Sequence, residues 1–305
     1  MAFTILHKVQ LAKRANEIRC SVIEMLSEAG SGHTAGPLGM ADIFAYLYFH
    51  ALRHDPKKPH WSGRDRLVLS NGHICPVYYA TLASAGYFPK EHLLTLRKFG
   101  SSLQGHPWRE KLDGIETSSG PLGSGLSQAI GMALGDRMDE GRAGSSYFYV
   151  LMSDGELNEG QTWEAAQLAA KERLGSLIAI IDRNNIQIDG YTEDIMPLEP
   201  LADKWRAFGW HVREIDGHNF SDIHAAVGEA QNVFDQPSVI IAHTIPGKGV
   251  PDYERKPEWH GRVPTPAEAK RALQILSAAW GAGAKDLDAT TKGSDPAPSA
   301  STRIK

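Results

Sequence analysis

The 305-residue chain is 42% hydrophobic and 22% charged, which is the composition of an ordinary folded globular protein rather than a disordered one. Its length suits one large domain or two small ones. Acidic residues outnumber basic residues by 36 to 32, so the charge gives no case for binding nucleic acid or an anionic membrane surface.

The first half of the chain is predicted to be mostly helical. Residues 8–29 place apolar side chains on one stripe at helical spacing, and Gly30-Ser31-Gly32 ends that helix. Further helices are expected over residues 39–51, 76–86, 90–98 and 126–138, and a short strand over residues 65–70. Residues 104–125 are rich in Gly, Pro and Ser and lack periodicity, and a loop this long within a compact domain is usually functional or disordered.

The second half alternates between apolar strands and helices. Strands are predicted over residues 147–153, 176–182, 211–215 and 237–244, and helices over 161–174, 201–209, 221–232 and 265–280, with Ser221 as the N-cap of the third helix. Near-continuous apolar strands separated by helices indicate an α/β fold, a parallel sheet between two helical layers. We therefore predict one domain over residues 1–281 and a disordered tail over 282–305.

Two features indicate the compartment. Cys20 and Cys75 are the two cysteines and form no disulfide framework, which suits a reducing environment. The N-terminal segment carries frequent charges, unlike a signal peptide, and no apolar run approaches the roughly 18 residues of a membrane-spanning helix. We expect a cytoplasmic protein that contacts neither membrane nor nucleic acid.

Polar residues follow several of the predicted strands, at the edge where ligands bind in open parallel sheets. Asp154 and Asn184 follow two strands joined by one crossover helix, so they are expected to be neighbours. A carboxylate and an amide oxygen suit Mg²⁺ or Ca²⁺, and Gly155 lets a phosphate approach the backbone. The alternative is an N-cap aspartate and a turn asparagine, both of which are common.

The segment "SDGELNEGQTWEAAQLAAKERLGSLIAIIDRNNIQIDG", residues 153–190, resembles the thiamine diphosphate motif, an Asp-Gly followed after about thirty residues by Asn. Other segments resemble transketolase and occur in the same order: "SGHTAGPLG" (31–39), "DRLVLSNGH" (65–73), "QGHP" (104–107), "SSGPLGSGLSQAIGMA" (118–133), "IDG" (188–190) and "PEWHG" (257–261). The resemblance covers residues 10–265, but the length matches only the N-terminal half of a full transketolase. The chain therefore resembles the N-terminal subunit of a split transketolase.

The resemblance implies a thiamine diphosphate-binding fold and a set of cofactor contacts. Asp154, Asn184 and the Ile186 carbonyl would hold Mg²⁺ or Ca²⁺ on the diphosphate. The residues expected at the cofactor are His73, Gly120, Pro121, Leu122, Gly155, Glu156, Glu159, Asn184, Ile188 and His260. Glu159 would also belong to a carboxylate network that links paired active sites.

The resemblance assigns a catalytic role to four of the thirteen histidines. His33, His73, His106 and His260 each lie in a loop bearing Gly or Pro, and they would surround the reactive carbon and the sugar hydroxyls. Histidine titrates near neutral pH, as proton transfer to sugar hydroxyls requires. The others are interpreted as surface or structural residues, with His218 the least certain: His7, His50, His54, His60, His92, His211, His218, His224 and His243.

The implied activity is transfer of a two-carbon ketol unit from a ketose phosphate to an aldose phosphate. The residues that activate the aminopyrimidine and bind the sugar phosphate lie in a second domain of transketolase, so a C-terminal partner subunit with that pyrimidine-binding domain is expected, in a dimer of heterodimers. Ser153 replaces a motif glycine, and Trp108 stands where transketolases often carry an acid. The alternatives are the α subunit of a 2-oxoacid dehydrogenase, a transketolase for an unusual sugar, and an inactive regulatory half.

Overall fold

The computed structural model describes residues 3–140, 146–188 and 190–291, and its centre is a five-stranded parallel sheet. The strands are β1 (Arg66–Leu69), β2 (Phe148–Ser153), β3 (Leu177–Arg183), β6 (His211–Asp216) and β7 (Ser238–His243), and their order across the sheet is β1-β2-β3-β7-β6. Every neighbouring pair in the sheet is parallel, so all five carboxyl ends lie along one edge.

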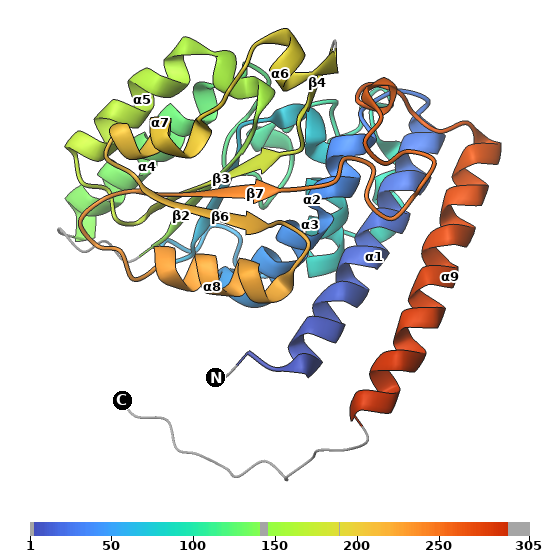
Figure 1. The fold of residues 1–305 in the computed structure, drawn as a ribbon. Helices are drawn as coiled ribbons and strands as arrows, with labels where there is room; N and C mark the ends of the chain where they lie inside the picture. The colour runs from blue at the N-terminus through green and yellow to red at the C-terminus, as the bar shows by residue number, and fades with distance from the viewer. Residues whose placement is uncertain (1–2, 141–145, 189, 292–305) are drawn as a thin grey trace, which may run out of the picture.

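Helices cover both faces of this sheet, which confirms the predicted three-layer α/β architecture (Figure 1). One face packs against α1 (Ile5–Ala29), α2 (Ala35–Tyr46), α3 (Cys75–Ala85) and α8 (Phe220–Ala230), and the other against α4 (Ser124–Glu140), α5 (Gly160–Lys171) and α7 (Leu201–Ala207). Strand residues alternate between the two cores, because successive side chains point to opposite faces. In β2, for example, Tyr149 and Leu151 enter the first core and Val150 and Met152 the second.

A small antiparallel hairpin lies beyond the carboxyl edge of the sheet. It consists of β4 (Ile186–Gln187) and β5 (Gly190–Tyr191) and continues into the one-turn helix α6 (Thr192–Ile195). None of these elements was predicted from the sequence. The hairpin matters because it carries the residues that follow Asn184 along the wall of the candidate site.

The structure corrects several predicted boundaries. Residues 90–98 contain a 3-10 helix, Lys90–Thr95, instead of an α-helix, and α2 begins four residues earlier than predicted and ends in a π-helical turn, Leu47–Ala51. The N-cap of α8 is Asn219, whose side chain accepts from the Ser221 backbone N–H, so the prediction of Ser221 was wrong.

The last helix, α9 (Pro266–Thr291), packs along α1 and continues beyond Gly281, where the predicted tail begins. The remaining predicted tail, residues 292–305, lies outside the described residues. No helix in the described ranges is long and apolar enough to cross a membrane.

Candidate functional site

The two predicted metal ligands lie at the ends of neighbouring strands. β2 and β3 pair in parallel with Ser153 opposite Asp182, so Asp154 and Asn184 both follow directly at the carboxyl edge. Asp154 is fully buried, whereas Asn184 is partly exposed and lines a cavity. The sheet register therefore brings together the pair that the sequence predicted.

The Asp154 carboxylate is fixed by three donors. The backbone N–H of Gly155 donates to Oδ1 at 2.8 Å, and the backbone N–H of Asn185 donates to Oδ2 at 2.6 Å. The guanidinium of Arg183 lies 3.4 Å from the same Oδ2. Burial raises the pKa of Asp154 to about 6, and these three donors limit the rise by stabilising the charged form.

Asn184 is oriented by a second buried carboxylate. Its side-chain Nδ2 donates to Asp182 Oδ2 at 2.8 Å, and its Oδ1 accepts from the Ile186 backbone N–H at 2.9 Å. Asp182 in turn accepts from the hydroxyl of Thr244, which follows β7. Burial and the nearby Asp154 raise the pKa of Asp182 to about 7. The Asp182 carboxylate thus fixes which end of the Asn184 amide is the oxygen.

The side-chain oxygens of Asp154 and Asn184 are suitable ligands for a hard divalent cation that also binds phosphate oxygens. Among the described residues, Asp154 Oδ1 and Asn184 Oδ1 each accept only one hydrogen bond, so each retains a lone pair for a metal ion. Within the described ranges, no three His, Cys, Asp or Glu side chains are grouped to hold a metal by themselves. A site with one carboxylate and one amide suits Mg²⁺ or Ca²⁺ completed by a diphosphate, and it does not suit zinc.

A cavity of about 250 Å³ opens above these ligands. It is lined by most of the predicted site residues, which come from loops far apart in the sequence: His33, His73, His106, Gly120, Leu122, Gly155, Glu156, Asn184, Ile186, Ile188 and His260. A Cβ atom at Gly155 would lie 3.0 Å from the Cβ of Gln187, so a larger residue would crowd the cavity wall here. Ser153, which replaces the motif glycine, also lines the cavity.

Three predicted residues do not line the cavity. Asp154 is fully buried between Ser153 and Gly155, which do line the cavity, and Pro121 and Glu159 are exposed. Glu159 therefore does not face the site within this chain. It lies exposed between the 3-10 helix Gly155–Asn158 and α5.

Glu156 lines the cavity, and its hydrogen bonds connect the loops around it. It is fully buried, and it accepts from the Ser70 hydroxyl and from the backbone N–H groups of Gly123 (2.6 Å) and Ser153 (3.1 Å). Ser70 also accepts from the Gly125 N–H at 3.0 Å. The ends of β1 and β2 are thus tied to the long loop over residues 104–125, which is ordered and forms one wall of the site.

Three of the four predicted catalytic histidines form a compact cluster at the cavity. The ring centroids of His33, His73 and His260 lie 4.9–5.4 Å apart, and His106 lines the same cavity from the loop. Burial lowers the pKa of all four, and that of His33 falls to about 4 because neighbouring histidines and Arg97 add to the effect. The cluster is therefore neutral near pH 7.

His218 has a structural role, as was expected for the histidines outside the four motifs. Its Nδ1 lies 2.7 Å from Asp42 Oδ2, and its Nε2 accepts from the Ile245 backbone N–H at 2.8 Å. Asp42 is also paired with the buried Arg19. This network fixes the loop after β7 against α2, whose start directly follows the His33 loop.

The sequence analysis gave no role to Arg183, which contacts a predicted metal ligand. It is only 2% exposed at the end of β3. A signal was present, because a charged residue that ends a seven-residue buried strand must be paired to remain buried. The sequence did not reveal the partners, since three of the four, Thr192, Glu193 and Glu199, come from the segment after the hairpin.

Comparisons with known proteins agree with this geometry. Residues 11–282 match the family described as "Transketolase, thiamine diphosphate binding domain". The 6-deoxy-6-sulfo-D-fructose transketolase subunit SqwG of Clostridium sp. (strain MSTE9) is 46% identical over 88% of this chain and 97% of its own length. One subunit of the apulose-4-phosphate transketolase of Phocaeicola vulgatus is 40% identical over 88% of this chain and 94% of its own length.

The fold is also similar to that of solved transketolases. The crystal structure of transketolase from Pichia stipitis in complex with sedoheptulose-7-phosphate superposes with a TM-score of 0.82 at 31% identity, covering 93% of this chain. This chain spans only 45% of that one. Its length therefore corresponds to nearly all of either named subunit and to slightly less than half of the solved transketolase.

Proposed function

Because this chain belongs to the transketolase family through its thiamine diphosphate-binding domain, we propose that it is the N-terminal subunit of a two-chain cytoplasmic transketolase. The observation that supports the proposal is one cavity that is lined by Asn184 and four predicted catalytic histidines, with Asp154 at the end of the neighbouring strand. The α subunit of a 2-oxoacid dehydrogenase, which shares the metal motif, is disfavoured by the match to the transketolase family.

In the proposed site, Asp154, Asn184 and the Ile186 carbonyl hold Mg²⁺ or Ca²⁺ against the diphosphate of thiamine diphosphate. Gly155 leaves the backbone open to a phosphate, and Gly120 and Leu122 form the opposite wall. When bound, the cofactor supplies the reactive carbon on which ketol transfer depends. The protein contributes the orientation of that group and a cavity from which water is displaced.

The histidine cluster is proposed to move protons at the sugar hydroxyls. His33, His73 and His260 have lowered pKa values, so near pH 7 each ring has a free nitrogen lone pair that accepts a proton from a hydroxyl. The same ring then returns the proton when the acceptor aldose is bound. His106, at the exposed side of the cavity, is placed to contact the substrate where it enters.

A partner chain is proposed to complete the site. The two subunit relatives have this chain's length, whereas the solved transketolase is about twice as long. The exposed Glu159 would join a carboxylate network with that partner, in a dimer of heterodimers. The partner would supply the aminopyrimidine-binding domain and the contacts to the sugar phosphate.

The names of the two subunit relatives favour a specialised substrate. One is named for 6-deoxy-6-sulfo-D-fructose and the other for apulose-4-phosphate, neither of which is a common pentose phosphate. We therefore propose a ketose and an aldose that each carry an anionic terminal group, a phosphate or a sulfonate. Residues of the partner chain would bind this phosphate or sulfonate and distinguish between the two.

The test is reconstitution with a chain that resembles the C-terminal half of transketolase from the same organism. The mixture with thiamine diphosphate and Mg²⁺ is expected to transfer a ketol unit between sugar phosphates, and each chain alone is expected to be inactive. The His33→Gln, His73→Gln and His260→Gln variants should bind the cofactor with little transfer. Robust transfer by this chain alone would refute the two-chain proposal, and a reconstituted pair that takes up no cofactor would favour an inactive regulatory half.

A further inference from the structure

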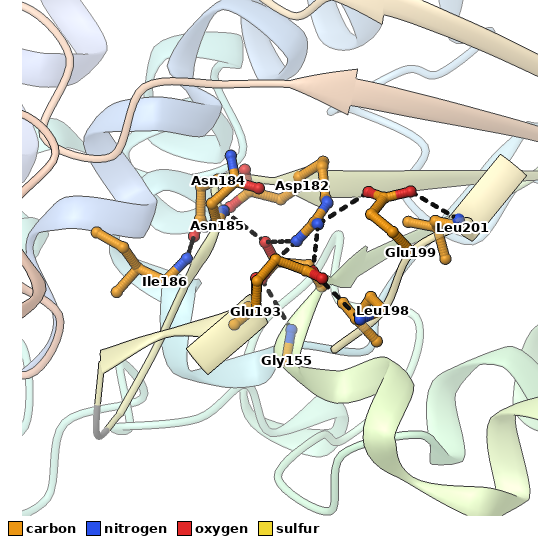
Figure 2. Close-up of polar contacts among 12 residues, drawn as sticks. Gly155, Asp182, Asn184, Asn185, Ile186, Glu193, Leu198, Glu199 and Leu201 are labelled. Atoms are coloured by element: carbon orange, nitrogen blue, oxygen red, sulfur yellow. Dashed lines mark hydrogen bonds and ion pairs between the residues drawn. The ribbon is translucent and has the colours of Figure 1, made fainter. Parts of the chain in front are cut away.

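Arg183 joins a predicted metal ligand to the segment that follows the hairpin. One of its nitrogens, Nη1, lies 3.4 Å from Asp154 Oδ2 and donates to the Thr192 hydroxyl at 2.8 Å. The other, Nη2, donates to Glu193 Oε1 at 2.7 Å and to Glu199 Oε1 at 3.0 Å. Figure 2 shows Glu193, Glu199 and Asn184 close together in this network of polar contacts.

The contact with Asp154 leaves the metal-binding oxygen free. Arg183 and the Asn185 N–H both approach Oδ2, whereas Oδ1 accepts only from Gly155 among the described residues. Two hydrogen-bond donors on Oδ2 restrict rotation of the carboxylate, so Oδ1 keeps its position beside the Gly155 N–H. At 3.4 Å the attraction from Arg183 is mainly electrostatic, and it is strengthened because both groups are almost fully buried.

The other acceptors fix the chain between Thr192 and Leu201. Glu193 Oε1 also accepts from the Leu198 N–H at 3.1 Å, and Glu199 Oε2 accepts from the Leu201 N–H at 2.8 Å. The side chains of Glu193 and Glu199 are 41% and 56% exposed, so water would solvate them without Arg183. Arg183 is therefore the cationic partner shared by both carboxylates, in addition to these two backbone N–H groups.

We propose that Arg183 is a positioning residue that keeps Asp154 oriented for the metal ion and couples metal binding to the order of the Thr192–Glu199 segment. The inference rests on the proposed cofactor site and goes beyond it, because it makes that segment responsive to the metal. A guanidinium is required since its planar fork reaches the hydroxyl and the carboxylates at once, which a lysine ammonium on one stem does not.

The coupling is tested first on the chain alone, by amide hydrogen exchange and mass spectrometry. Arg183→Gln is expected to speed exchange of the amides of Leu198 and Leu201 by 10-fold or more, with the sheet amides unchanged. Arg206→Gln is the matched control, because Arg206 is a half-exposed arginine on α7 whose ion pair is with Asp203 of the same helix. Equal exchange in Arg183→Gln and Arg206→Gln would overturn the coupling to the segment.

The metal is tested by calorimetric titration of Mg²⁺ into the reconstituted pair at saturating thiamine diphosphate. Outer-shell partners of metal ligands commonly contribute about 10–100-fold to metal affinity, so a loss in that range is expected for Arg183→Gln, with partial recovery in Arg183→Lys. In the wild type, Mg²⁺ with thiamine diphosphate should slow exchange over residues 192–199. Unchanged Mg²⁺ affinity in Arg183→Gln would overturn the positioning role.

Two further outcomes separate this inference from the proposed function. If the wild-type pair takes up neither Mg²⁺ nor cofactor, the proposed function fails and the metal part of the inference fails with it, while the exchange result still decides the coupling.

If Arg183→Gln does not fold, Thr192→Val replaces it, because it removes one acceptor of the guanidinium and keeps the side-chain shape. Thr192→Val is then expected to weaken Mg²⁺ binding and to speed exchange, and unchanged values would overturn the inference.

Discussion

At the scale of single residues, the site depends on buried carboxylates whose donors come from other strands. Asp182 is only 1% exposed, and it accepts from the Thr244 hydroxyl and from the Asn184 amide. A buried carboxylate that loses a donor has no water to replace it, so the full desolvation cost appears as lost stability. The hydroxyl of Thr244 therefore stabilises both the fold and the orientation of Asn184.

Thr244→Val is predicted to lower the free energy of unfolding by about 1–3 kcal/mol, because a donor to a charged buried acceptor is lost while the side-chain shape is kept. The measurement is urea unfolding at pH 8, where Asp182 is ionised because its pKa is about 7. Thr162→Val is the matched control, since Thr162 is fully buried and its hydroxyl has no hydrogen-bond partner among the described residues. Thr162→Val should leave the free energy of unfolding unchanged or raise it. Equal decreases in the free energy of unfolding of the two variants would contradict the argument.

The same residues show how far the sequence could predict the site. Asp154 and Asn184 were predictable because each follows an apolar strand, and parallel strands end at one edge. The position of Glu156 in the motif did not reveal that its carboxylate is satisfied by Ser70 and two backbone N–H groups. Two of these donors, Ser70 and Gly123, are more than 30 residues away in the sequence, which local patterns do not describe.

At the scale of elements, the start of α8 shows where a local pattern was misread. Ser221 was predicted as the N-cap, but the helix begins at Phe220 and the cap is Asn219. The Asn219 side chain accepts from the Ser221 N–H at 2.9 Å, which satisfies one of the free N–H groups of the first turn. Both residue types are good N-caps, so composition alone did not distinguish them.

Asn219→Ala is predicted to lower the free energy of unfolding by about 1 kcal/mol, the usual effect of losing an N-cap. Ser221→Ala is the matched control, because Ser221 contributes only its backbone N–H to the cap. It should change stability by less than about 0.5 kcal/mol. Urea unfolding of the two variants in parallel measures the difference, and a larger loss in Ser221→Ala would restore the original assignment.

Short elements near the site were the hardest to predict. The hairpin β4–β5 has two residues in each strand, and α6 is a single turn, so neither shows a periodic pattern. Their conformation instead depends on tertiary contacts, such as the Thr192 N–H to the Asn185 carbonyl and the Arg183 side chain. The long apolar strands and α1 were confirmed because their patterns extend over many residues.

At the scale of the whole molecule, the exposed apolar side chains around the hairpin indicate where a partner would bind. Ile188, Tyr191, Ile195 and Met196 are 43–74% exposed, and they adjoin the cavity through Ile188, which lines it. Clustered exposed apolar residues usually mark an interaction site. The occupant proposed here is the C-terminal transketolase chain, because the proposed function requires that chain to complete the cavity that Ile188 lines.

The double variant Ile195→Glu/Met196→Glu is therefore predicted to weaken assembly with that chain by 10-fold or more, since burying two carboxylates in an apolar interface costs well above the roughly 1.4 kcal/mol that this factor represents. Phe234→Glu is the control, because Phe234 is 77% exposed but precedes β7, at the opposite edge of the sheet from the site. Sedimentation velocity of the mixed chains measures the affinity, and circular dichroism of each variant alone should be unchanged. If Phe234→Glu abolished assembly and the double variant did not, the partner would bind at the amino edge of the sheet, away from the proposed cofactor site, and the prediction would be wrong.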